Sequence, residues 1–99
     1  MSIVTAKAIL TPRPEGWAIG AFNVHNLEDV QAVVWAAEKS RAPVILMVSE
    51  SALKYAGAPY ISSIARVAAE QTEIPIALQL DHGHSPEIAL ECMRLGFSA

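Results

Sequence analysis

The sequence predicts an α/β protein built around a parallel β-sheet. Three short, apolar segments with the composition of strands occupy positions 17–23, 44–49 and 76–81, and each ends in a polar residue. They recur roughly every 30 residues, and the stretches between them show helical spacing. Strands that alternate with helices in this way are typical of repeated βα units, in which successive strands run parallel.

The first predicted helix follows the first strand. Asn26 is a suitable N-cap, and Asp29 three residues later resembles the second member of a capping box. The helix should end near Ser40, before Pro43. Its apolar stripe consists of Leu27, Val30, Val34 and Ala37.

The second predicted helix starts around Ala58, with Pro59 as an early helical residue. We expect Lys54 and Tyr55 to lie on the loop that precedes it. Its buried face should consist of Ile61, Ile64, Ala65 and Ala68.

The third predicted helix has Ser85 as its cap, Pro86 as its first residue and Gly96 as a C-terminal stop. Ile88, Cys92 and Leu95 follow at helical spacing. Residues 97–99 resemble the approach to a fourth strand.

At the amino end, an amphipathic piece over 3–10 precedes a break at Pro12, Arg13 and Pro14. Trp17, at the start of the first strand, and Trp35, on the first helix, are expected to be packing residues.

Composition excludes several classes of protein. Of the 99 residues, 53% are apolar and 17% charged, which argues against disorder. The net charge is −3 and the seven Lys and Arg residues are spread along the chain, so we expect no nucleic-acid partner. No apolar run reaches the roughly 18 residues of a membrane span, so we expect no membrane partner. The single cysteine, Cys92, is expected in the core and fits a reducing compartment. The N-terminus lacks the charged-then-apolar profile of a signal peptide, so a cytoplasmic location is predicted.

Polar residues stand at the ends of all three predicted strands: Asn23, Ser49 and Asp81, which is followed by His82. The carboxyl ends of parallel strands share one edge of a sheet, where the βα loops and helix N-termini face ligands, so these side chains should converge there. A carboxylate beside an imidazole provides a proton-transfer group next to a metal ligand.

Structural explanations compete with this functional one. Asn23 could be a turn residue, Ser49 a local hydrogen-bonder and Asp81 a cap for backbone amides. His84 could join a metal site, but Zn²⁺ usually takes three or four ligands from separate elements. His25 fits a loop histidine better than a metal ligand.

Three blocks in order, GAFNVHN at 20–26, PVIL at 43–46 and LDHG at 80–83, resemble the class II fructose-bisphosphate and tagatose-bisphosphate aldolases. The resemblance covers the whole chain and includes LKYAG at 53–57 and RLGFS at 94–98. It implies a TIM (β/α)8 barrel with a catalytic Zn²⁺. The implied reaction is reversible cleavage of a ketose 1,6-bisphosphate to dihydroxyacetone phosphate and glyceraldehyde 3-phosphate.

The resemblance also assigns roles to residues. Asp81 matches the catalytic acid/base, and His82 matches one of three zinc-binding histidines. Ser49 matches a serine that contacts substrate phosphate, and Asn23 an asparagine near the same site. The chain departs from the family at Gln79, where members usually have His, and at the Gly83 and His84 positions.

Length sets the expected domain organisation. A barrel takes about 250 residues, so residues 1–99 should form the N-terminal portion of one barrel domain, roughly its first three βα units. The remaining zinc ligands are expected downstream. Because one histidine cannot hold a catalytic zinc, this chain alone is expected to be inactive.

The sequence leaves several hypotheses for the function. Fructose 1,6-bisphosphate is favoured as substrate, with tagatose 1,6-bisphosphate as the alternative. A non-catalytic half-barrel fragment and a different phosphate-binding barrel enzyme are further hypotheses. We expect a phosphorylated sugar as the ligand and, because an unpaired sheet edge favours association, a homo-oligomer.

Overall fold

The computed structural model describes residues 2–11 and 14–99. The elements follow one another as α1 (Ala6–Leu10), β1 (Gly20–Asn23), α2 (Leu27–Ser40), β2 (Val44–Ser49), α3 (Glu50–Ala56), α4 (Ala58–Glu70), β3 (Ile76–Asp81) and α5 (Pro86–Arg94). A break was predicted at Pro12, Arg13 and Pro14, and the first two of these residues lie outside the described residues. No helix in the described part of the chain is both long enough and apolar enough to cross a membrane.

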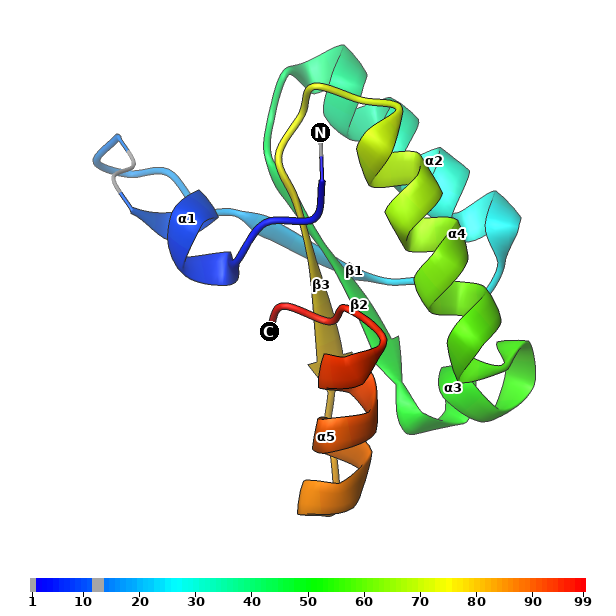
Figure 1. Ribbon diagram of the computed structural model, residues 1–99. Coiled ribbons are helices and arrows are strands. Elements are labelled where there is room, and N and C mark those ends of the chain that lie inside the picture. The colour runs from blue at the N-terminus through cyan, green and yellow to red at the C-terminus, as the bar shows by residue number, and fades with distance from the viewer. Residues whose placement is uncertain (1, 12–13) are drawn as a thin grey trace.

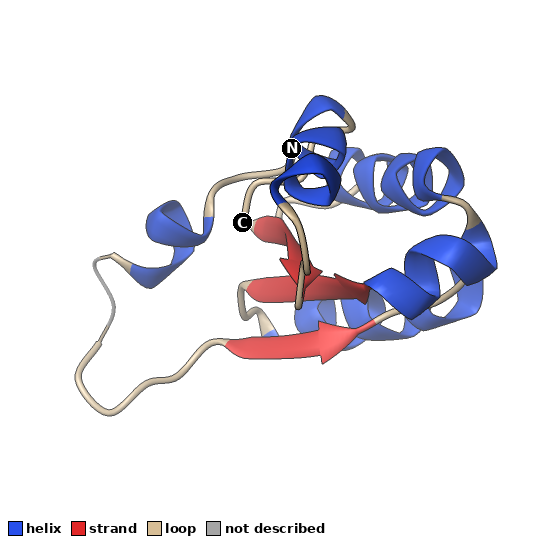
Figure 2. Ribbon diagram, turned by 90° about the horizontal axis from the view of Figure 1, so that it is seen from below, coloured by secondary structure: helices blue, strands red, loops and turns tan. Residues whose placement is uncertain are grey.

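The strands form one parallel sheet in the order β1-β2-β3, as the βα pattern predicted. Val44 of β2 lies opposite Gly20 of β1 and opposite Ile76 of β3. At the other end of the sheet, Ser49 lies opposite Asp81. All three strands therefore end at the same edge, which Figure 2 shows with the arrowheads on one side of the sheet.

The main core lies between the sheet and its helices. In Figure 1, α2 and α4 lie side by side on one side of the strands. Alternate strand residues point towards them, and Leu46, Leu78 and Ile61 are fully buried in this cluster. Full burial of one such side chain contributes roughly 1.5–3 kcal/mol of hydrophobic free energy.

The opposite face of the sheet is covered only in part. Ile9 of α1 packs against Ile45 and Ala77, near the amino ends of β2 and β3. Further along the same face, Asn23 is exposed, and Ser49 and Asp81 are partly exposed. This face therefore has an apolar half near the amino ends and an open polar half near the carboxyl ends.

The N-caps of α2 and α5 act as the sequence predicted, whereas the Asp29 carboxylate accepts from the His25 amide at 3.0 Å and does not close a capping box on Asn26. Asn26 Oδ1 accepts a hydrogen bond from the Asp29 amide at 2.8 Å, and Ser85 Oγ accepts one from the Ile88 amide at 3.4 Å. At the end of α5, Gly96 has φ +98°, a conformation that L side chains rarely adopt. The predicted ends of α2 and α5 are thus confirmed to within two residues.

The predicted loop around Lys54 and Tyr55 is wrong, because both residues lie on α3. Ser49 caps this helix by accepting a hydrogen bond from the Ala52 amide at 3.2 Å. Gly57 ends it, with its amide bonded to the Leu53 carbonyl. A capped helix with a buried side therefore replaces the expected loop, and Lys54 and Tyr55 are on its exposed side.

The first strand is shorter than predicted, because its pairing with β2 begins at Gly20 and not at Trp17. The Trp17 amide instead donates to the Pro14 carbonyl in a turn. Trp17 is 54% exposed and Trp35 is 62% exposed, so the expected packing role is not seen for either side chain in this chain. Leu27, expected on the buried stripe of α2, is 47% exposed; it is the first residue of the helix.

Residues 98–99 run along β3. The Ser98 amide donates to the Leu78 carbonyl at 2.8 Å, and the Leu80 amide donates to the Ala99 carbonyl at 2.9 Å. This exchange of backbone hydrogen bonds agrees with the expected approach to a fourth strand.

Candidate functional site

The polar residues that end the strands converge at the carboxyl edge of the sheet. Asn23 Nδ2 donates a hydrogen bond of 2.9 Å to Asp81 Oδ2, although 58 positions separate the two residues. They belong to β1 and β3, so the bond crosses above β2. The structure therefore brings these two predicted site residues into direct contact and orients the carboxylate.

One carboxylate oxygen of Asp81, Oδ1, takes no part in the hydrogen bond from Asn23. Its side chain is 22% exposed, and Oδ1 lies 3.6 Å from His82 Nε2, beyond hydrogen-bond distance. The competing idea that Asp81 is a backbone cap finds no support among the described hydrogen bonds, where its partner is the Asn23 amide group. A partly exposed carboxylate with one free oxygen is suited to exchanging a proton with a bound molecule.

Ser49 stands at the same edge, opposite Asp81 in the register. Its oxygen accepts the capping hydrogen bond from the Ala52 amide, so the structural role considered for it exists. A serine hydroxyl that accepts one bond still carries a hydrogen to donate. Ser49 can thus cap α3 and also donate to a ligand anion.

His82 follows Asp81 and points into solvent. Its side chain is 92% exposed, and its backbone has φ +64°, in the left-handed region that is uncommon for residues other than glycine. The next residue is Gly83, where an added Cβ would come within 2.6 Å of a Leu80 methyl group. In this tight turn the imidazole lies in solvent, away from the sheet.

The other two histidines each face a carboxylate. His25 Nδ1 lies 3.0 Å from Asp29 Oδ2, one turn along the chain, as expected for a loop histidine. His84 Nδ1 contacts Glu50 Oε1, which belongs to α3. Sequence reasoning missed this second pair. The signal for α3, a Ser49 cap followed by Glu50 in the first turn, was present, but nothing in the sequence pairs Glu50 with His84.

Among residues 2–11 and 14–99, no group of three or more His, Cys, Asp or Glu side chains is placed to hold a metal ion. His82 offers an accessible imidazole suited to zinc, whereas a catalytic zinc needs about three protein ligands. The described residues therefore fit one ligand of such a site and not the whole site.

Gln79 and Cys92 occupy different environments. Gln79 lies two residues before Asp81 on the same strand face and is partly exposed, so its side chain is on the face that carries the site. Cys92 is 1% exposed in the main core. Burial raises the pKa of its thiol, and the negative charges of Glu91 and Glu50 raise it further. The expected core role of Cys92 is confirmed.

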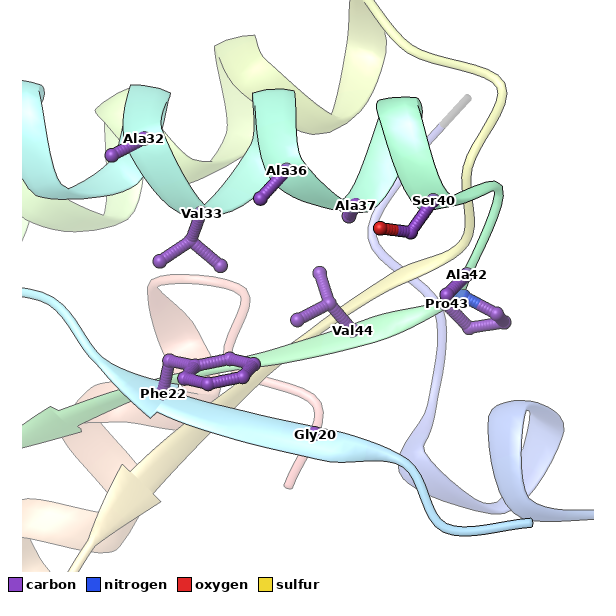
Figure 3. Close-up of a pocket in the computed structure, with 10 residues that line it drawn as sticks. All are labelled: Gly20, Phe22, Ala32, Val33, Ala36, Ala37, Ser40, Ala42, Pro43 and Val44. Atoms are coloured by element: carbon purple, nitrogen blue, oxygen red, sulfur yellow. The ribbon is translucent and has the colours of Figure 1, made fainter.

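An apolar hollow lies elsewhere, on the helix side of the sheet. It has a volume of about 400 Å³ between β1 and α2, and Figure 3 shows Phe22, Val33 and Val44 projecting into it. Alternation along the strands places Phe22 and Val44 on the face opposite Asn23 and Asp81. The hollow is thus separate from the polar edge.

Comparison with known proteins identifies the family. The sequence pattern of the family described as fructose-bisphosphate aldolase class-II matches residues 4–99. The chain belongs to this aldolase family. The fructose-bisphosphate aldolase of Thermus caldophilus is 43% identical over 98 residues, which are 98% of this chain and 32% of that protein. The fructose-bisphosphate aldolase of Treponema pallidum is 46% identical over 89 residues, which are 85% of this chain and 27% of that protein.

Aldolases also share the fold. The crystal structure of the YdjI aldolase from Escherichia coli K12 superposes with a TM-score of 0.78 at 30% identity, covering 82% of this chain and 31% of that one. The chain therefore spans about a third of the length of the aldolases it matches. The α/β class with a parallel sheet is shown, and at the level of the family the predicted enzyme class, a lyase, is supported.

Proposed function

We propose that the complete protein to which this chain belongs catalyses the reversible aldol cleavage of a ketose 1,6-bisphosphate. Fructose 1,6-bisphosphate is the favoured substrate, and dihydroxyacetone phosphate and glyceraldehyde 3-phosphate are the products. The observation that carries the proposal is the Asp81 carboxylate, oriented by Asn23 and adjacent to His82. In a class II aldolase chain, this is an acid/base group beside a possible metal ligand.

Asp81 is proposed as the catalytic acid/base. In the cleavage direction it takes the proton from the C4 hydroxyl, and in the condensation direction it returns that proton. Asn23 holds Oδ2, so Oδ1 is the oxygen available for the transfer. Ser49, whose hydroxyl hydrogen is not used in capping α3, is proposed to donate to a substrate phosphate.

His82 is proposed as one ligand of a zinc ion whose other ligands belong to the rest of the complete protein. Bound zinc would act as a Lewis acid at the substrate ketone and stabilise the enediolate. Among the described residues no group of three metal-binding side chains surrounds His82, so we propose that the isolated chain is inactive.

The chain is proposed to be the N-terminal portion, residues 1–99, of a single TIM barrel domain. Three parallel strands in sequence order, with residues 98–99 beginning to pair along β3, are what the first βα units of a barrel require. The apolar hollow beside β1 would then be covered by the last βα unit. Reading the open reading frame beyond codon 99 tests this proposal, and a frame that ends there would support the non-catalytic fragment instead.

The test of the function compares Asp81→Ala with His82→Ala in the complete protein. Asp81→Ala should lower turnover by roughly 10²–10⁴-fold, because a positioned acid/base is lost, while zinc content stays unchanged. His82→Ala should lose zinc, and excess Zn²⁺ should restore part of its activity. Turnover and metal analysis on both proteins measure the difference.

Two outcomes would overturn these assignments. If Asp81→Ala lost zinc and regained turnover when the metal was resupplied, Asp81 would be a ligand or a support for one. If His82→Ala retained its zinc, the proposed metal role would be wrong. Assays on fructose and tagatose 1,6-bisphosphate, which differ in configuration at C4, distinguish the two substrates. The segment from His25 to Glu28 slightly resembles the tagatose branch, whereas Ser49-Glu50 and the segment from Asp81 to Gly83 resemble the fructose branch, which is why fructose 1,6-bisphosphate is favoured.

A location and an assembly state are also proposed. We propose the cytoplasm, because the one thiol of the sequence, Cys92, is buried in the core and suits a reducing compartment. A homo-oligomer is proposed for the complete protein.

A further inference from the structure

The turn that carries His82 is short and constrained at both ends. We define it as the loop 82–85, between the end of β3 at Asp81 and the start of α5 at Pro86. At its amino end, His82 has the left-handed φ of +64°. At its carboxyl end, Ser85 is fixed as the N-cap of α5. The backbone between these two ends carries His82 and includes Gly83 and His84.

The imidazole of His82 has little packing of its own. Its side chain is 92% exposed, and its one described side-chain contact is the 3.6 Å approach to Asp81. An exposed side chain is held in place mainly by the backbone that carries it. A group that fixes the loop backbone therefore fixes where the Cβ of His82 stands and limits the positions that its imidazole can reach.

His84 provides such a fixing contact. From the middle of the loop its ring reaches Glu50, which is 34 positions earlier and directly follows Ser49 at the end of β2. The Glu50 side chain is 26% exposed and lies on α3, whose Ala52 and Leu53 are buried in the main core. The contact thus ties the loop to a helix anchored in the core.

We propose that the His84–Glu50 pair is a positioning clamp that holds the loop 82–85 so that His82 is in place to bind zinc. Neither residue touches the metal or the substrate in this role. The proposal rests on the proposed function, because it takes His82 to be a zinc ligand. By holding the loop before the metal arrives, the clamp increases zinc affinity through preorganisation.

The experiment measures zinc affinity in the complete protein by competition with a chelator. His84→Ala and Glu50→Ala should each weaken zinc binding about tenfold, the lower end of the effect of groups that support metal ligands. The double variant should be no weaker than either single variant, because one clamp is removed in each case. His84→Gln, which keeps a hydrogen-bond donor for Glu50, should stay within about threefold of the parent.

One reference variant and two further measurements on His84→Ala separate a clamp from a general structural effect. His25→Ala removes the other histidine–carboxylate pair at this edge and should leave zinc affinity unchanged. Turnover of His84→Ala at saturating zinc should match the parent, because the defect is in metal occupancy. Amide exchange of Gly83 should accelerate in His84→Ala, which reports on the loop without using activity.

The outcomes are distinguishable. If His82→Ala loses zinc while His84→Ala and Glu50→Ala bind it as tightly as the parent, the clamp is wrong and the proposed function stands. If His82→Ala retains zinc, or if the open reading frame ends at Ala99, the metal role of His82 is wrong and the clamp falls with it.

Discussion

Asp81 depends on a residue two strands away. The bond from Asn23 fixes one carboxylate oxygen, and the short β1 ends where the amide can reach across β2. The strand pattern predicted that both residues stand at one edge, since that follows from parallel strands alone. Their hydrogen bond was not predicted, because it depends on the lengths of two separate strands and on side-chain reach.

Asn23 should therefore be a positioning residue for the carboxylate. In the complete protein, Asn23→Ala should lower kcat by about 10–100-fold, the effect expected from losing a hydrogen bond to a charged group, with zinc content unchanged. Asn23→Asp should lower it further, because a second carboxylate would then face Asp81. Steady-state kinetics with metal analysis measure both. Unchanged turnover in Asn23→Ala would show that Asp81 needs no such support.

The elements show where sequence patterns predict well. The bounds of β2 and β3 agree with the prediction because buried parallel strands form continuous apolar runs with clear ends. The α3 helix was missed because it is short and directly follows a strand. Its signals are an N-cap at Ser49 and a stop at Gly57, and seven residues are too few to show a helical period.

The N-cap of α2 offers a test at the level of one helix. Asn26→Ala removes the acceptor for the Asp29 amide, which should cost about 1 kcal/mol. In a protein the size of a barrel domain this corresponds to a fall in Tm of about 2–4 °C. Thermal unfolding measures the change. Asn26→Ser is the matched control, because serine keeps a capping oxygen and should stay close to the parent. Equal falls in both variants would mean that the cap contributes nothing specific.

At the scale of the whole molecule, the polar edge and several apolar side chains are both exposed, but for different reasons. The polar half of the sheet is open at the carboxyl edge, as a ligand site must be. On the other face, Phe22 is 51% exposed beside the hollow at β1, and Trp35 on α2 is 62% exposed. The sequence could not indicate this exposure. A helical or strand period shows which apolar residues share a face, but not whether another part of the protein covers that face. In a closed barrel such surfaces are covered by further βα units.

The isolated 99-residue chain should consequently self-associate. Among the described strands, β1 pairs with β2 alone, so its other edge presents backbone groups that a second copy can pair with. The hollow beside this edge adds exposed apolar surface, and burying that surface between two copies would stabilise their association. Sedimentation velocity at micromolar concentration should show dimers or larger species, with little monomer. Phe22→Lys places a charge beside the edge and should shift the distribution towards monomer, whereas Tyr60→Lys, at an exposed position on α4, should leave it unchanged. A compact monomer for the parent chain would show that the open edge does not drive association.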